Sequence, residues 1–266
     1  MVYLTPEEAL GVVPRQRGWV VEIGFGNGAF LKWLSTRFDL VLGLDIANLA
    51  FEKAKSRLSG TNAVVVKSDA RFFLRYLVAP RSLFEVYILF PDPWPKNRKR
   101  RLIDADFARL LSSRLEAGGR VYVATDHEDY ALQIEETLGS VMRKDDWRLP
   151  VATKYMLKWQ RMGRGYRGFC FVNHRPVEMD FTPALRSISL KHEITARVGR
   201  VVRSEDALLK VDGLFERGKR RLYRLIYSEG GLSSRYFFLQ EDGFLFSLNT
   251  WGEVFPPRMV ELLKLL

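Results

Sequence analysis

A glycine-rich turn in the sequence has the residue types and spacing to bind a nucleotide-like ligand. Glycines permit a tight turn and let backbone N–H groups approach a ligand at the start of a helix. The predicted ligand contacts in this turn are Gly24, Gly26, Asn27 and Gly28. The spacing alone fits several nucleotide-binding motifs and also a turn without a ligand, so the surrounding residues must decide between them.

Three acidic residues near the turn indicate which ligand it suits. Glu22 lies two residues before the first glycine, and Asp45 and Asp69 end or follow the next two apolar runs. Asp45 suits the hydroxyls of a ribose, and Asp69 followed by Ala70 suits an adenine amino group. Glu22 would repel a pyrophosphate but attract the ammonium and sulfonium of S-adenosylmethionine, which favours this cofactor over a nicotinamide dinucleotide. For Asp69, capping of the next helix is the structural alternative.

The second informative stretch is residues 90–101, which combines prolines, an aromatic residue and a basic run. It reads Phe-Pro-Asp-Pro-Trp-Pro, followed by six residues of which five are basic. We expect the prolines to hold this segment against the methyl donor, with the basic residues close by. Trp94 either stacks on a target base or packs against the proline turn. A solvated charge run is the alternative for the basic residues.

These stretches require a parallel sheet to bring them together. Residues 1–150 alternate short apolar runs with helical patterns, which is typical of βαβ units. We expect strands at 19–23, 40–46, 63–67, 84–90 and 120–125, helices at 29–38, 49–58, 71–77, 103–115 and 127–141, and an antiparallel pair formed by 147–151 and 166–173. The expected fold is a doubly wound, mostly parallel α/β sheet of seven strands.

The pattern changes near residue 176, which predicts a first domain at 1–175 and a β-rich extension at 176–266. We expect strands at 221–227, 236–240 and 244–248 and a final helix at 258–265. The expected core phenylalanines of the extension are Phe237, Phe238, Phe244 and Phe246. Its basic side chains suit contact with RNA, and stabilisation of the fold or of an interface is the competing role. The five we single out are Arg217, Lys219, Arg220, Arg221 and Arg224.

On these motifs the chain resembles the bacterial tRNA (guanine-N7)-methyltransferase family, which modifies a guanine in the variable loop of tRNA. The similarity covers roughly 15–175 and lies in five segments, 22–28, 90–96, 98–102, 124–126 and 153–155. The proline-rich segment is highly specific to this family, whereas the glycine turn is shared by many proteins. The resemblance implies a class I methyltransferase fold, S-adenosylmethionine as the cofactor and tRNA as the partner.

The resemblance also implies roles for individual residues. Glu22, Asp45, Asp69 and Asp92 would line the cofactor pocket, with Asp92 at the catalytic position. The target nucleotide would be bound by Lys96, Asp126, Thr153 and Lys154, and RNA would contact Arg98, Arg100 and Arg101. For Asp126, capping of the helix expected from His127 is an alternative.

The sequence departs from the family pattern in several places. Asp45 stands where the family more often has glutamate, and the loop after Lys96 is about two residues shorter than usual. Met156 occupies the position of a family glutamate, which puts that guanine contact in doubt. Residues 176–266 have no counterpart in most members.

Composition fits a cytoplasmic protein that binds a polyanion. The net charge is +11, and most of the excess lies beyond residue 150. Residues 151–175 contain six basic side chains and no acidic ones, which predicts a surface that follows RNA phosphates. One cysteine and three histidines far apart make a disulfide and a metal site unexpected, and no apolar run is long enough for a membrane span. The sequence does not indicate an oligomeric state.

Three other functions remain open from the residues. A base-amino methyltransferase would carry Asp/Asn-Pro-Pro-aromatic, but here one proline separates Asp92 from Trp94. A nicotinamide oxidoreductase shares the glycine turn, although no Tyr/Lys or His/Asp catalytic pair stands out. A non-catalytic RNA-binding protein is made more credible by Met156, whereas the complete set of acidic residues favours an enzyme.

Overall fold

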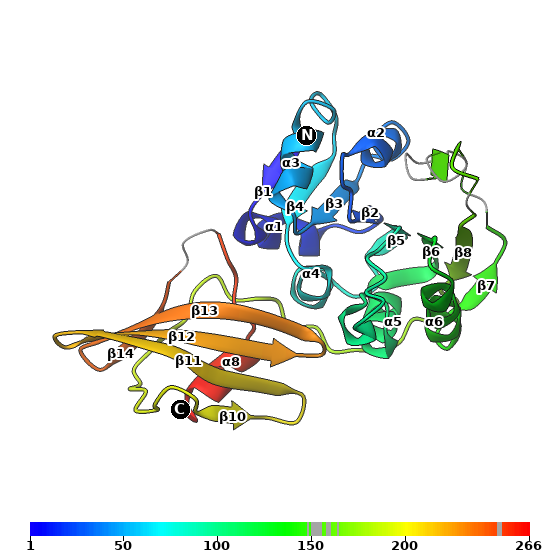
Figure 1. Ribbon diagram of the computed structural model, residues 1–266. Coiled ribbons are helices and arrows are strands. Elements are labelled where there is room, and N and C mark those ends of the chain that lie inside the picture. Colours follow the sequence, from blue (N-terminus) through cyan, green and yellow to red (C-terminus); the bar gives the residue numbers. More distant parts are fainter. Residues whose placement is uncertain (148, 150–155, 158–160, 164, 249–251) are drawn as a thin grey trace. The chain divides into compact units, whose positions relative to one another are not determined.

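The structure is a computed structural model that describes residues 1–147, 149, 156–157, 161–163, 165–248 and 252–266 (Figure 1). The chain divides into two compact units. Unit 1 comprises Met1–Leu4 and Gly11–Phe181, and unit 2 comprises Thr5–Leu10 and Thr182–Leu266. In the part of the chain that the structure describes, no helix is long and apolar enough to cross a membrane.

Unit 1 is built on an eight-stranded sheet with the order β1-β4-β3-β2-β5-β6-β8-β7. Its strands are β1 (Val2–Leu4), β2 (Trp19–Ile23), β3 (Val41–Asp45), β4 (Val64–Lys67), β5 (Leu83–Leu89), β6 (Leu115–Thr125), β7 (Arg143–Asp145) and β8 (Arg167–Val172). The first six strands in the sheet order are parallel, while β8 runs antiparallel to β6 and to β7. The doubly wound, mostly parallel sheet is thus confirmed.

The expected count of seven strands is wrong because an additional strand, β1, pairs with β4 at one edge. Arg143–Asp145 forms an antiparallel partner of β8, which the sequence did not predict. Of the predicted partner 147–151, residues 148, 150 and 151 lie outside the described residues. Both edge strands have three residues, and neither has a buried side chain. Short exposed strands lack the apolar alternation from which strands are predicted.

Helices cover both faces of the sheet in unit 1 (Figure 1). The helices of unit 1 are α2 (Ala29–Ser35), α3 (Asn48–Lys55), α4 (Ala70–Tyr76), α5 (Ala105–Arg114) and α6 (Glu128–Gly139), with short 3-10 turns at Val13–Arg15 and Arg98–Arg100. A further helix, α1 (Pro6–Val12), crosses the boundary between the two units. Helices α2 and α3 pack one apolar cluster against the sheet, with Phe30 and Leu31 against Val20 and Val41. Because both faces are covered, every residue of β2 is buried.

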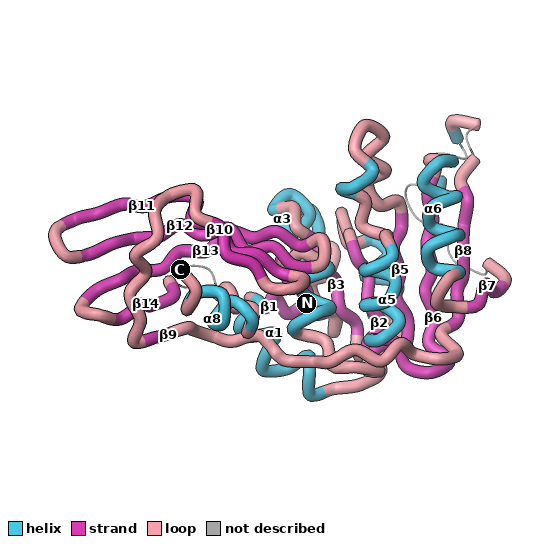
Figure 2. The backbone as a smooth tube through the Cα atoms, turned by 90° about the horizontal axis from the view of Figure 1, so that it is seen from below, coloured by secondary structure: helices cyan, strands magenta, loops and turns pink. Residues whose placement is uncertain are grey.

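Unit 2 is a six-stranded antiparallel sheet with a helix on one face (Figure 2). The elements are β9 (Ser189–Leu190), β10 (Val201–Arg203), β11 (Ala207–Arg217), β12 (Arg220–Glu229), β13 (Leu232–Glu241), β14 (Phe244–Ser247) and α8 (Arg258–Leu263). The core of the unit contains Leu209, Leu225 and Phe238 from the sheet, together with Met259 and Leu262 from α8.

Only one of the four phenylalanines expected in the core of unit 2 lies there. Phe238 is buried, whereas Phe237, Phe244 and Phe246 are 37%, 40% and 39% exposed. Neighbouring residues of a strand point to opposite faces of the sheet, so Phe237 cannot share the environment of Phe238. Phe244 and Phe246 are two residues apart and lie on the same exposed face.

Candidate cofactor and substrate site

Five neighbouring parallel strands of unit 1 each carry an acidic residue at or after their carboxyl end. These are Asp69 after β4, Asp45 at the end of β3, Glu22 on β2, Asp92 after β5 and Asp126 after β6. The chain crosses from β4 over β2 to β5, so the end of β2 is the topological switch point of the sheet. Ligands of open α/β sheets bind at such points. All five carboxylates therefore lie at the same edge of the sheet.

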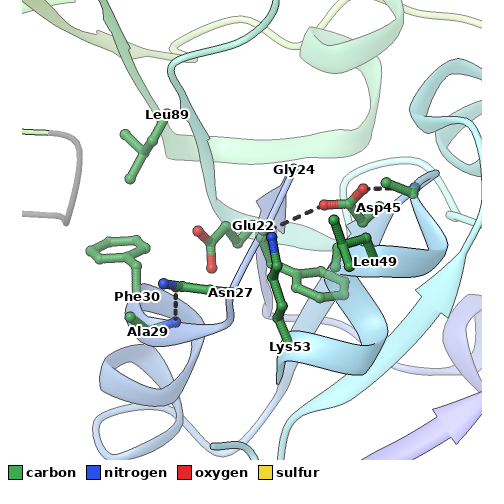
Figure 3. A pocket seen from close by; sticks show the side chains of 13 residues that line it. Glu22, Gly24, Asn27, Ala29, Phe30, Asp45, Leu49, Lys53 and Leu89 are labelled. Atoms are coloured by element: carbon green, nitrogen blue, oxygen red, sulfur yellow. Dashed lines mark hydrogen bonds between the residues drawn. The ribbon is translucent and has the colours of Figure 1, made fainter. Parts of the chain in front are cut away.

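A pocket of about 280 Å³ opens at this edge (Figure 3). Five predicted cofactor residues line it, namely Glu22, Gly24, Gly26, Asn27 and Asp45. Among the described residues, the lining does not include Gly28, Asp69, Ala70 or Asp92. The prediction missed several lining residues that follow the glycine turn or lie on neighbouring elements. The main ones are Phe25, Phe30, Leu49, Lys53 and Leu89.

The glycine turn has a backbone that side chains disfavour. Gly24, Gly26 and Gly28 have φ values of 79°, 55° and 71°. A Cβ atom on Gly28 would lie 2.9 Å from the Cβ of Ala54 on α3. Gly28 is therefore required because helix α3 approaches the turn closely, while Gly24 and Gly26 face the pocket. The side chain of Asn27 accepts a hydrogen bond of 3.1 Å from the Ala29 N–H at the start of α2.

Glu22 is the most unusual residue of the pocket. Its side chain is buried, with 4% of the residue exposed, and Oε2 has no hydrogen-bond partner among the described residues. Burial raises the pKa of this carboxyl to about 8, the negative charge of Asp45 adds to the effect, and a backbone hydrogen bond from Leu31 opposes it. A buried carboxylate oxygen without a donor is costly for the protein. A cationic group in the pocket would supply the missing partner.

Asp45 is held in place by the backbone of two turns. Its Oδ2 accepts a hydrogen bond of 3.1 Å from the Gly26 N–H, and its Oδ1 accepts one of 2.9 Å from the Ala47 N–H. Each carboxylate oxygen keeps a second lone pair, which a ligand hydroxyl can use. Leu49 lines the pocket near Asp45 and is 54% exposed, so it offers an apolar surface beside these acceptors.

Asp69 caps helix α4, as the structural alternative proposed. Its Oδ1 accepts hydrogen bonds from the N–H groups of Arg71 (2.8 Å) and Phe72 (3.2 Å). The capping alternative for Asp126 is wrong, because the N-cap of α6 is His127, whose ring nitrogen accepts from the Tyr130 N–H. Asp126 itself is exposed at the end of β6.

The proline-rich segment begins and ends its turn with strained aromatic residues. Phe90 and Trp94 have φ values of 60° and 40°, in a region that bulky residues rarely adopt. The Phe90 N–H donates a 2.7 Å hydrogen bond to the Ala124 carbonyl, which ties the turn to β6. The guanidinium of Arg100 lies 3.7 Å from the centre of the Trp94 ring and occupies one of its faces. Strain of this kind is found at functional sites.

Arg101 is buried beneath the proline-rich segment and binds it through the Pro93 carbonyl. The residue is 1% exposed, and its guanidinium donates three hydrogen bonds of 2.7 Å, to the Pro93 carbonyl, to Oε1 of Gln133 and to Oδ2 of Asp129. The prediction that Arg101 contacts RNA is therefore wrong, because its N–H donors point into the protein. The signal that was missed is the pair Asp129 and Gln133, one helical turn apart on α6.

A second buried arginine completes the support of the loop. Arg71 on α4 donates hydrogen bonds to the carbonyls of Arg101 (3.2 Å) and Leu102 (2.7 Å) and forms a bidentate pair with Asp104. Asp104 also caps α5 by accepting from the Phe107 N–H. The loop between the proline turn and α5 is thus anchored to three helices.

The other basic residues of the loop are exposed. They are Lys96, Arg98, Lys99 and Arg100. Arg98 forms a 2.7 Å ion pair with Asp129, and the hydrogen bond from Arg101, helped by the charge of Arg98, lowers the pKa of the Asp129 carboxyl. Thr153 and Lys154 lie outside the described residues, and Met156 is buried. In the described ranges, no group of three or more potential ligands from His, Cys, Asp and Glu is placed to hold a metal ion.

A parallel sheet with a glycine turn and acidic residues at its switch point defines an α/β protein of the class I methyltransferase type. The profile of a family described as "putative methyltransferase" matches residues 16–167. Curated proteins similar to the chain carry the name tRNA (guanine-N7)-methyltransferase. The chain belongs to the family of these tRNA (guanine-N7)-methyltransferases.

Three relatives show the extent of the similarity. The protein from Thermus thermophilus is 35% identical over 201 residues, which cover 71% of the chain and 64% of that relative. The protein from Thermotoga maritima is 41% identical over 159 residues, which cover 54% of the chain and 50% of that relative. The protein from Syntrophotalea carbinolica is 32% identical over 188 residues, which cover 64% of the chain and 79% of that relative. The chain thus spans about half to two thirds of the length of the first two relatives.

Proposed function

We propose that the protein transfers a methyl group from S-adenosylmethionine to N7 of a guanine in tRNA. The observation that carries the proposal is the buried Glu22 carboxyl, which lines a pocket at the switch point of a methyltransferase sheet and whose Oε2 has no hydrogen-bond partner among the described residues. The names of the relatives support the choice of guanine N7 and of tRNA.

The pocket residues fit S-adenosylmethionine. Glu22 supplies the acceptor that the amino group of the cofactor needs. An ammonium and a sulfonium in the pocket would favour the ionised form of the Glu22 carboxyl, beside the negative charge of Asp45. The free lone pairs of Asp45 suit the ribose hydroxyls, and Leu49 provides an apolar surface for the adenine. Asp69 and Ala70 remain our candidates for the adenine amino group. When bound, the cofactor supplies an electrophilic methyl group on its sulfonium.

The residues of the chain have mainly to position the guanine and to stabilise charge. Guanine N7 has an in-plane lone pair and no proton, so no base is needed to create the nucleophile. Orientation alone can contribute roughly 7–11 kcal/mol of barrier lowering. Asp92 and Asp126 follow neighbouring strands and are exposed at the same edge of the sheet. We assign to them the N–H donors of the guanine ring and the positive charge that develops on it.

The exposed basic residues of the loop are suited to hold the RNA backbone. Lys96, Arg98 and Arg100 follow the proline turn directly, so a phosphate bound by them would bring its nucleotide close to Asp92. Thr153 and Lys154 remain candidates on the basis of the resemblance. Binding that depends on phosphates weakens steeply as the salt concentration rises. We therefore expect the affinity for tRNA to fall steeply between 50 and 200 mM salt.

The proposal is tested by incubating the protein with labelled S-adenosylmethionine and a tRNA transcript, followed by nucleoside analysis. We expect 7-methylguanosine, and we expect none from a matched transcript whose variable-loop guanine is replaced by adenine. A methyl group on an exocyclic amine would indicate a base-amino methyltransferase. Tight tRNA binding without any transfer of label would indicate a non-catalytic RNA-binding protein. Either result contradicts the proposal.

A further inference from the structure

The sheet of unit 2 has an outer face that none of the helices described in this unit covers. Helix α8 and the apolar core pack against one face of the sheet, which includes Leu209, Leu225 and Phe238. The alternate residues of the same strands point the other way. We call this opposite side the outer face, and the residues used below to describe it are Phe215, Arg224, Arg235, Phe237, Phe244 and Phe246.

The outer face carries aromatic rings where an antiparallel sheet normally exposes polar residues. Phe215 on β11 is 53% exposed, and three further phenylalanines on β13 and β14 are between 37% and 40% exposed. The rings of Phe244 and Phe246 lie nearly parallel, with centroids 6.0 Å apart. A cluster of exposed apolar side chains on one face indicates a binding surface.

Arginines stand among these rings. In the strand register Arg224 is directly opposite Phe237, and its guanidinium also lies 6.0 Å from the centre of the Phe215 ring. Arg235 is one cross-strand pair away, opposite Ile226. The carboxylate of Asp212 forms ion pairs with both arginines, at 2.8 Å from Arg224 and 3.7 Å from Arg235. Basic residues thus exceed acidic ones on the outer face, and they include Arg203, Lys210 and Arg217.

We propose that the outer face of unit 2 binds unpaired nucleotides of RNA. Exposed aromatic rings on a sheet accept stacked bases, and arginines beside them hold the phosphates. The excess of positive charge favours a polyanion over a neutral protein partner. It also opposes pairing with a second copy of this chain, since two faces with the same excess of positive charge repel each other. The proposal concerns binding alone and does not depend on the methyl transfer proposed above.

The proposal is tested with the full-length protein and a fluorescently labelled single-stranded U12 oligonucleotide, by anisotropy. The variant Phe237→Ala/Phe246→Ala should weaken binding about tenfold or more, since each stacked base contributes on the order of a factor of ten. Phe237→Trp/Phe246→Trp should restore it, because tryptophan keeps a stacking surface. Leu265→Ala, at a residue that is 58% exposed in the same unit, is the matched control and should bind like the wild type.

The variant Phe237→Leu/Phe246→Leu separates stacking from general apolar contact. It should bind the oligonucleotide as weakly as the alanine variant. It should stay closer to the wild type in melting temperature than the alanine variant does, because leucine keeps apolar contacts of rings that are only 37% and 39% exposed. Wild-type affinity in the leucine or alanine variant would overturn the proposal. A dimer in sedimentation analysis that these variants dissociate would also overturn it, since the face would then bind a second copy. Failure of methylation with intact U12 binding would contradict the proposed enzymatic function alone.

Discussion

Replacing Glu22 with glutamine should stabilise the ligand-free protein and at the same time weaken the binding of S-adenosylmethionine. The two effects have one origin, because the carboxyl lies buried and its Oε2 has no partner among the described residues, so that its ionisation is unfavourable until a cationic ligand binds. Glutamine has nearly the same shape and carries no charge. A residue that lowers stability for the sake of a ligand is expected at a binding site and not in a structural core.

The size of the stability effect follows from the pKa of Glu22, which burial raises from 4.5 to about 8. The folded protein thus holds this proton more tightly than the unfolded chain does. The tightly held proton stabilises the folded protein. This contribution to the free energy of unfolding is fully present below pH 4.5 and is lost as the pH rises to about 8. At pH 7, two and a half pH units above 4.5, the loss is about 3–4 kcal/mol at about 1.4 kcal/mol per unit. Glu22→Gln should avoid this loss.

The assay is thermal unfolding of the ligand-free proteins between pH 5 and pH 8.5, together with calorimetric titration of S-adenosylmethionine. The melting temperature of Glu22→Gln should exceed that of the wild type by a margin that grows with pH. Its affinity for the cofactor should fall about 10- to 100-fold, the value of a hydrogen bond to a charged group. Glu85→Gln is the matched control, because the buried Glu85 already accepts a hydrogen bond from the Tyr87 hydroxyl. A Glu22→Gln protein that is less stable at pH 7, or that binds as well as the wild type, would refute the reasoning.

Three further predictions concern the loop, the catalytic position and the glycine turn. Arg101→Met should lower the stability of the first unit by about 3 kcal/mol and reduce kcat/KM with tRNA, because it removes three buried hydrogen bonds, whereas Arg98→Met should leave the melting temperature unchanged. Equal melting temperatures of the two variants would contradict this assignment. Asp92→Asn should lower kcat about 100-fold at saturating tRNA without changing tRNA affinity, and Asp106→Asn on an exposed position of α5 serves as its control. Near wild-type turnover would remove Asp92 from the catalytic position. Gly28→Ala should be less stable than Gly60→Ala by about 1–3 kcal/mol in denaturant unfolding, since both have positive φ but only Gly28 faces Ala54 at 2.9 Å. Equal losses would show that the backbone and not the packing requires Gly28.

The central part of the first unit could be predicted because its signals are local and repeated. Buried strands such as Trp19–Ile23 are short apolar runs, and the glycine turn marks where the first one ends. Once five parallel strands are placed, Glu22, Asp45 and Asp92 must come to the same edge of the sheet. The pocket residues Lys53 and Leu89 were not predicted, since they are ordinary residues of a helix and a strand whose orientation depends on packing.

The remaining features depend on contacts between distant residues. Arg101 belongs to a basic run, and nothing in that run distinguishes the one arginine that turns inward to Asp129 and Gln133. The edge strand Val2–Leu4 forms only because β4 offers it a free edge. In the second unit, the register decides which phenylalanines face the core. The dipeptide Phe237-Phe238 contains one of each kind, and composition cannot show which is which.

The most direct test of the account is a crystal structure of the protein with S-adenosylhomocysteine, which keeps the amino group, ribose and adenine of the methyl donor. We expect the amino group to contact Oε2 of Glu22 and the ribose hydroxyls to contact Asp45, with the sulfur on the side of Asp92. Electron density for the ligand away from the end of β2, with Glu22 still unpartnered, would contradict the account.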